Sequence, residues 1–190
     1  MNTNTYLIPD HSETMSLQVV VELDGFQHGQ SPFYIKRMAI RSVAFPIQKS
    51  VDLVLPPEAL PTCPEELPTY QTQTALHGLS PDDPGLYRLA KNAAIRNTVI
   101  LASRFAQASL GLRIRKETLY VKGRQKMELL STSLPFLSDF QVQVLNLEEI
   151  GCPSLETLGL RDMPVSAPTK VETLTTWLRA TELRNFAALD

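Results

Sequence analysis

Two acidic side chains are the first residues in the sequence that could carry out chemistry. Glu22 and Asp24 close an apolar segment, residues 17–24, whose valines and leucines predict a β-strand. Residues two apart on a strand point to the same side, so both carboxylates would share one face. Carboxylate oxygens are the ligands that hard cations such as Mg²⁺ prefer, and the pair could therefore hold a metal ion. The alternative is a solvated pair of acids at the edge of a sheet.

A second group of residues could bind phosphates. Residues 113–126 carry six basic side chains against one acid, Glu117. On one interpretation they contact a nucleic-acid backbone, with Tyr120 available to stack on a base. On the other, they form a solvated face beside a buried strand, as most charged runs do. The six are Arg113, Arg115, Lys116, Lys122, Arg124 and Lys126.

Other reactive residues are sparse. The three histidines, His11, His28 and His77, fall in expected loops. Cys63 and Cys152 stand far apart, with no CxxC pair and no histidine at ligand spacing, so we expect neither a zinc site nor a disulfide framework. The sequence also lacks P-loop, GxGxxG, GxSxG and HExxH motifs. The acidic pair and the basic cluster are therefore the only chemical signals.

The N-terminal half of the chain predicts an antiparallel sheet. Three strands are expected, over residues 17–24, 33–43 and 51–55. Gly25 is expected to end the first of them. Five prolines in residues 56–68 predict a loop, because proline fixes φ and lacks an N–H donor. The same segment, extended to Tyr70, is a candidate partner-binding segment, since proline lowers the entropy cost of docking in an extended form.

The C-terminal half alternates helices and strands. Ser80 to Pro84 is a helix-start pattern, and this helix is expected to run to about residue 109. Strands are then expected over 117–123 and 140–147, and helices over 124–130 and 169–187. Thr169 is a candidate cap of the last helix. Three antiparallel strands followed by alternating helices and strands predict an α/β fold, a ribonuclease H-like mixed sheet with helices on its faces.

Five short motifs occur in order along the chain. They are Asp24-Gly25-Phe26, Tyr34-Ile35-Lys36-Arg37-Met38-Ala39-Ile40, Leu76-His77-Gly78-Leu79, Tyr120-Val121-Lys122-Gly123 and Ile150-Gly151-Cys152-Pro153-Ser154-Leu155. Together they resemble the exonuclease-like ribonuclease H-fold proteins of arthropod genomes, over roughly residues 19–178. In size and fold type the chain is also similar to ribonuclease H-like germline factors of small-RNA pathways.

The resemblance implies a nuclease chemistry, but the residues at two of the expected positions imply that this activity is lost. In active members of this superfamily, carboxylates at strand ends bind two Mg²⁺ or Mn²⁺ ions, which activate a water and stabilise the leaving oxygen. The resemblance implies Asp24, Glu22 and Glu172 as the catalytic residues, of which Asp24 and Glu22 would bind the metal. Such folds supply another acid after the fourth strand and a histidine with an acid in the last helix. This chain instead has Lys122-Gly123-Arg124 and Lys170 there, and positive charges oppose cation binding.

These departures leave two functions open. The first is a catalytically inactive ribonuclease H-like adaptor that binds a protein partner or nucleic acid, either RNA or DNA. RNA silencing is the setting that the resemblance to germline factors implies. The alternative is an active 3′–5′ exonuclease or ribonuclease that depends on Mg²⁺ or Mn²⁺.

Length and composition favour one globular domain. The chain has 190 residues, and its 18 basic and 20 acidic side chains give a net charge of -2, which excludes a bulk polyanion binder. We expect a flexible N-terminus over residues 1–15, without the features of a secretory leader, and a single domain over residues 16–190. No apolar run approaches the roughly 20 residues of a membrane span. The expected location is therefore the cytoplasm or the nucleus.

Overall fold

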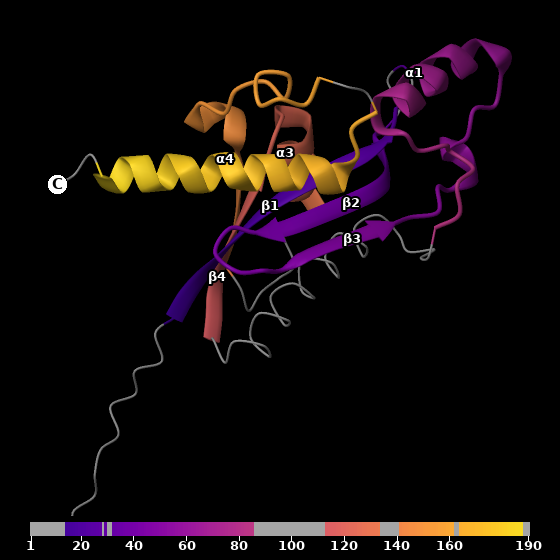
Figure 1. The fold of residues 1–190 in the computed structure, drawn as a ribbon. Helices are drawn as coiled ribbons and strands as arrows, with labels where there is room; N and C mark the ends of the chain where they lie inside the picture. Colours follow the sequence, from indigo (N-terminus) through magenta and orange to yellow (C-terminus); the bar gives the residue numbers. More distant parts are fainter. Residues whose placement is uncertain are drawn as a thin grey trace, which may run out of the picture.

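A five-stranded mixed β-sheet forms the centre of the protein (Figure 1). The computed structural model describes residues 14–27, 29, 32–85, 113–133, 141–161 and 164–187. The strands are β1 Thr14–Phe26, β2 Tyr34–Ser42, β3 Gln48–Asp52, β4 Arg113–Val121 and β5 Gln141–Asn146. They lie in the order β3-β2-β1-β4-β5, with β1–β2 and β2–β3 antiparallel and β1–β4 and β4–β5 parallel. The predicted α/β fold with a mixed sheet is confirmed.

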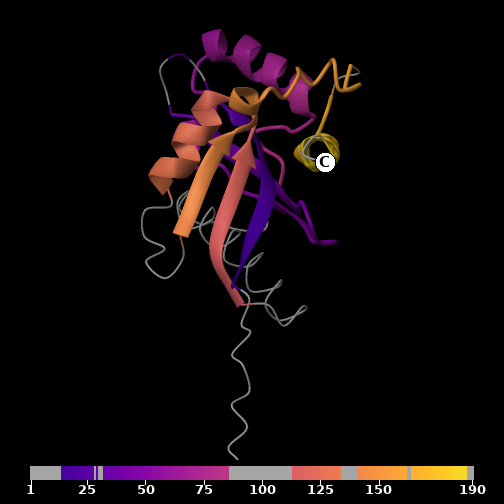
Figure 2. The same ribbon diagram turned by 90° about the vertical axis from the view of Figure 1, so that its left-hand side faces the viewer.

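Helices cover both faces of this sheet (Figure 2). Helix α3 (Arg124–Ser133) packs through Leu130 on one face, against alternate β1 residues such as Val19 and Val21. Helix α4 (Ala167–Ala187) packs on the other face, where Leu174 lies in one cluster with Val20. The run of three valines is therefore buried on both sides, which is why this segment forms the central strand. In the part of the chain that the structure describes, no helix is long and apolar enough to cross a membrane.

Gly25 does not end the first strand, as the sequence led us to expect. β1 continues to Phe26, and its register with β2 shifts between Asp24 and Gly25. A Cβ atom at Gly25 would lie 2.1 Å from the backbone oxygen of Tyr34. Glycine is thus required by the close approach of two backbones at this irregularity, and it does not break the strand.

The proline-rich segment packs on the core, and the loop predicted over residues 56–68 is interrupted by short helical turns. It contains two 3₁₀ turns, η1 (Pro57–Ala59) and η2 (Pro64–Glu66), and then helix α1 (Leu67–His77). Pro57 and Pro64 begin their turns, where the missing N–H donor costs nothing. Tyr70 of α1 is buried, stacks on Phe26 at a centroid distance of 5.3 Å, and donates its hydroxyl hydrogen to the Ala59 oxygen at 2.6 Å.

Several other boundaries differ from those predicted. β1 already begins at Thr14, inside the N-terminus that was expected to be flexible, and residues 1–13 lie outside the described residues. The third strand lies three residues earlier than expected, over Gln48–Asp52. Residues 81–85 form a turn and a bend and are not helical, and the remainder of the helix expected to about residue 109 lies outside the described residues. Helix α4 begins at Ala167, so Thr169 is not its cap.

Candidate functional site

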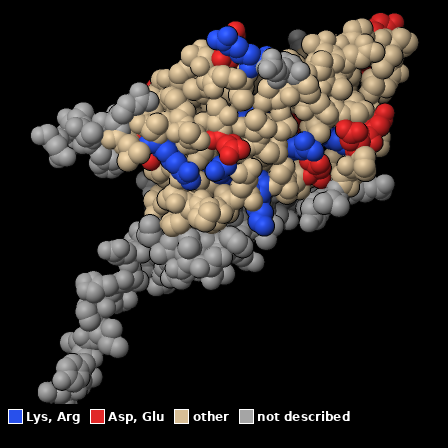
Figure 3. Space-filling model, in the orientation of Figure 1, with Lys and Arg blue, Asp and Glu red and all other residues tan. Residues whose placement is uncertain are grey.

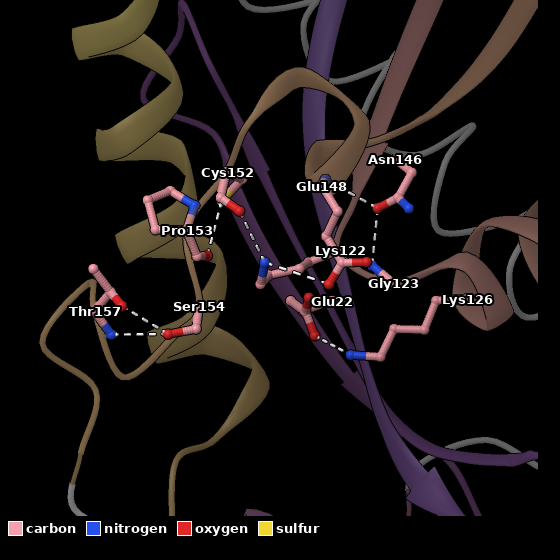
Figure 4. A network of polar contacts seen from close by, with 10 residues as sticks. All are labelled: Glu22, Lys122, Gly123, Lys126, Asn146, Glu148, Cys152, Pro153, Ser154 and Thr157. Carbon is pink, nitrogen blue, oxygen red and sulfur yellow. Dashed lines mark hydrogen bonds and ion pairs between the residues drawn. The ribbon is translucent and has the colours of Figure 1, made fainter.

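Acidic and basic side chains meet where β1, β4 and β5 end, at one edge of the sheet (Figure 4). β1 supplies Glu22 and Asp24, and the residue after β4 supplies Lys122. α3 and α4 supply Lys126 and Lys170. Parallel strands end together, so chemistry-bearing residues at their ends converge even though they are far apart in sequence. We call these five residues the lysine–carboxylate site.

Asp24 is held by α4. Its Oδ1 atom accepts a hydrogen bond from Lys170 Nζ at 2.5 Å, and its Oδ2 atom accepts one from the Ala167 backbone N–H at 2.6 Å. Both side chains are nearly inaccessible, with exposed fractions of 2% for Asp24 and 12% for Lys170. Asp24 therefore takes the place of an N-cap side chain, since it satisfies one free N–H group of the helix from a distant strand.

Glu22 is held by α3. Its Oε2 atom forms an ion pair with Lys126 Nζ, and its side chain is only 1% exposed. The other oxygen, Oε1, is buried and has no hydrogen-bond partner among the described residues. A buried carboxylate with one unpaired oxygen costs free energy, and the lysine offsets that cost by neutralising the charge.

A polar frame fixes the backbone around these two pairs (Figure 4). The Asn146 side-chain oxygen accepts hydrogen bonds from the Gly123 N–H at 3.0 Å and from the Glu148 N–H at 3.1 Å. Lys122 Nζ lies 3.5 Å from Glu148 Oε1 and donates to the Cys152 oxygen at 3.3 Å. Burial raises the pKa of the Cys152 thiol, which keeps it protonated. The frame ties the ends of β4 and β5 together.

Glu172, the third predicted catalytic residue, lies apart from this site and contacts a different residue. Its Oε1 atom lies 3.1 Å from Arg41 Nη1, and its side chain is 61% exposed. Residues two apart on a helix differ in direction by about 200°, so Lys170 and Glu172 point to opposite sides of α4. Within residues 14–85, 113–133, 141–161 and 164–187, apart from the few left undescribed, no three His, Cys, Asp or Glu side chains form a group that could hold a metal ion.

The described members of the basic cluster form ion pairs within the protein. Lys122 pairs with Glu148, Lys126 pairs with Glu22, and Arg124, although 81% exposed, pairs with Glu128 one helical turn away. The proposed stacking role of Tyr120 is wrong, because Tyr120 is buried in the core beneath α4 and burial raises its pKa. The side chains of Arg113, Arg115 and Lys116 lie outside the described residues.

The face of the molecule that α4 crosses shows no extended patch of one charge (Figure 3). Lysine and arginine side chains alternate there with aspartate and glutamate among the described residues. Opposite charges that alternate in this way cancel at short range, so this face attracts a polyanion only weakly from a distance.

His77 has a role that the sequence did not reveal. Its ring lies at the end of α1, where Nδ1 accepts the Leu79 N–H at 3.2 Å. Nε2 must therefore carry the hydrogen and donates to the Gly25 oxygen at 3.1 Å. Burial lowers the pKa of His77, so the ring is neutral. It links α1 to the irregularity in β1, next to Asp24; His11 and His28 lie outside the described residues.

Comparison with protein-family models, with curated proteins and with solved structures yields no match for this chain.

Proposed function

We propose that this chain is a ribonuclease H-like domain in which ion pairs replace the metal site, and that it works as a non-catalytic adaptor. The observation that carries the proposal is the pairing of Glu22 with Lys126 and of Asp24 with Lys170. A carboxylate neutralised by a lysine offers little net charge to a divalent cation, and the lysine itself repels that cation.

The sheet supports the ribonuclease H-like part of the proposal. β1 lies at its centre, the first three strands are antiparallel, and the strands that follow are parallel to β1. The resemblance implies this mixed sheet with helices on both faces. The acids of the β1 motif also lie at the strand ends, where active members of the superfamily collect their carboxylates.

A protein is the partner class that the charges favour. The described lysines and arginine of residues 122–126 are engaged in ion pairs, and Tyr120 has no exposed ring face. Nucleic-acid binding depends on cations that release counterions and on accessible aromatic rings. An adaptor with self-neutralised charges is better suited to a protein surface, where charged and apolar groups are mixed.

The experiment incubates the purified chain with labelled single-stranded RNA, single-stranded DNA and an RNA–DNA hybrid in Mg²⁺ or Mn²⁺. We expect no cleavage above the buffer control. Asp24→Asn and Glu22→Gln samples, checked for folding by circular dichroism, serve as matched controls. Cleavage by the wild type that both variants lose would overturn the proposal, whereas cleavage that persists in both variants would identify a contaminating nuclease.

The same labelled strands test the partner class. At low salt we expect fluorescence anisotropy to give dissociation constants weaker than about 10 μM, because a protein that binds nucleic acid through phosphate contacts is far tighter under these conditions. Tight binding that weakens steeply with salt and is reduced by Arg124→Glu would favour nucleic acid as the partner and contradict the choice of a protein.

A further inference from the structure

A hollow of about 430 Å³ lies between the end of α1 and the beginning of α4. Arg37 of β2 and Arg161 line it, together with the hydroxyl residues Ser166 and Thr169. We call it the arginine pocket. Its volume falls in the range of sites for small organic molecules, so it has room for more than a bare inorganic ion.

The described lining of the arginine pocket is positively charged. The only charged residues among the described lining are Arg37 and Arg161, and Arg161 is exposed with no ion-pair partner in the described part of the chain. Asp24 and Asp52 lie nearby, but Lys170 neutralises the first and Arg37 the second. Among the described residues, one positive charge, that of Arg161, therefore has no counter-ion.

Arg37 is held in a fixed orientation with a donor to spare. Asp52 accepts hydrogen bonds from its Nε and Nη2 atoms, the second at 2.7 Å, and these two bonds lock the plane of the guanidinium. The Nη1 group takes no part in this pairing and can donate to an anion. A guanidinium oriented in advance loses little side-chain entropy on binding.

Two hydroxyl groups complete the polar wall. Ser166 Oγ and Thr169 Oγ1 lie 3.2 Å apart, so one can donate to the other and still leave a hydroxyl hydrogen for a ligand. The Ala167 N–H group is already used by Asp24. Anion binding here therefore depends on the arginines and hydroxyls, and the start of α4 adds only a favourable field.

The walls are already joined to one another. The Val165 N–H donates to the Leu76 oxygen at 3.1 Å, which links the segment before α4 to the end of α1. Gly78, at φ +73°, approaches the ring of Pro164 so closely that a Cβ atom would lie 3.2 Å from it. This hydrogen bond and this close contact hold the walls in place before a ligand arrives, which lowers the entropy cost of ligand binding.

The apolar part of the wall is aliphatic. It consists of Leu160, Pro164 and Val165. His77 is the one aromatic ring among the described lining residues, and that ring is buried and packed edge-on against Phe26. A purine or pyrimidine would find no accessible ring face on which to stack.

We propose that the arginine pocket binds a small sugar phosphate, with the phosphate on Arg161, Arg37 Nη1 and the two hydroxyls. The sugar carbons contact the aliphatic wall. This ligand lies outside the adaptor function proposed above, and its binding requires neither a metal ion nor a macromolecular partner.

Isothermal titration calorimetry on the full chain tests the assignment with ribose 5-phosphate, AMP, ribose and inorganic phosphate. We expect ribose 5-phosphate to bind below about 1 mM and at least about tenfold more tightly than inorganic phosphate, with no heat from ribose. AMP should bind no more tightly than ribose 5-phosphate. Arg161→Ala should weaken binding about tenfold or more, because it removes the unpaired charge.

Arg124→Ala is the matched control, since Arg124 is also an exposed arginine but lies on α3 away from the pocket. It should leave the affinity unchanged. Three outcomes would overturn the proposal: no binding of ribose 5-phosphate, equal losses in the Arg124 and Arg161 variants, or AMP binding more tightly than the sugar phosphate. Each can be read without reference to cleavage or to nucleic-acid binding, so failure here is distinct from failure of the adaptor function.

Discussion

Asp24 on the central strand and Lys170 on the last helix form an ion pair across 2.5 Å, with both side chains almost fully buried. The second oxygen of the same carboxylate binds the Ala167 N–H at 2.6 Å. One side chain thus serves as ion-pair partner and as helix cap, and it joins α4 to β1 at the edge of the sheet where an acid could otherwise bind a cation.

Replacing Asp24 should destabilise the protein strongly. Asp24→Ala leaves Lys170 buried without a counter-ion and the start of α4 without a cap, and we expect a loss of about 3 kcal/mol in the free energy of unfolding. Urea titration followed by circular dichroism measures it. Glu128→Ala, which removes the exposed partner of Arg124, is the control and should cost about 0.5 kcal/mol or less. Equal losses in the two variants would show that the buried pair contributes nothing special.

Removing both lysines should create affinity for a divalent cation. In Lys126→Ala with Lys170→Ala, the carboxylates of Glu22 and Asp24 lose their positive partners while keeping their places on one face of β1. We expect millimolar Mg²⁺ or Mn²⁺ to raise the melting temperature of this variant by about 3 °C or more and to leave the wild type unchanged. Sodium chloride of matched ionic strength controls for screening. If Mg²⁺ or Mn²⁺ left the melting temperature of the variant unchanged, the view that the lysines occupy a metal position would be contradicted.

His77 should make the protein sensitive to mild acid. Burial lowers the pKa of the folded imidazole from its ordinary value of 6.5, so below that pH the unfolded chain binds more protons than the folded one. The free energy of unfolding therefore falls as the pH drops through 6.5. His77→Gln removes this titration. We expect the variant to have a lower free energy of unfolding than the wild type at about pH 7.5, and this difference to be smaller at about pH 5.5. A gap that widens in acid would disprove the assigned neutral ring.

Tyr70→Phe tests whether the proline-rich segment is part of the core. The change removes the hydroxyl that donates to the Ala59 oxygen and leaves that buried acceptor unpaired. We expect a loss of about 1 kcal/mol in the free energy of unfolding and faster hydrogen exchange of the Ala59 amide. Thr72→Ala, which removes an exposed hydroxyl bonded to the Pro68 oxygen, should change neither quantity appreciably. Identical exchange rates in the wild type and Tyr70→Phe would mean that the segment opens independently of Tyr70.

Strands β1, β2 and β5 could be predicted because their residues alternate or are wholly apolar, and burial in a sheet demands such patterns. Strand β3 has neither pattern and lies three residues before its predicted position. Helix α1 could not be predicted in the same way. Only Tyr70 and His77 of its eleven residues are buried, so it has no apolar stripe, and the prolines at and before its start suggested a loop. Pro57, Pro64 and Pro68 lie in first turns, where proline is compatible with helix.

The acidic residues of the lysine–carboxylate site could be predicted from the sequence, but the residues with which they form ion pairs could not. Glu22, Asp24, Lys122 and Lys170 could be identified from their positions at the ends of predicted elements. The contact of Lys126 with Glu22 spans 104 positions, and that of His77 with Gly25 spans 52. No local pattern encodes such contacts, because they depend on how the helices pack on the sheet. The same holds for Glu172, whose direction on α4 follows from the side on which Lys170 meets the strand.

The bond between Asp24 and Ala167 joins residues 143 positions apart, and this has a consequence for synthesis of the chain. β1, β2 and β3 emerge from the ribosome before β4 and α4, which cover the remaining edge and one face of β1. Until α4 is made, its face of β1 is uncovered and the Asp24 carboxylate lacks its two donors. We therefore expect the sheet and the last helix to form in one cooperative step, because the pairing of the central strand depends on residues far apart in the chain.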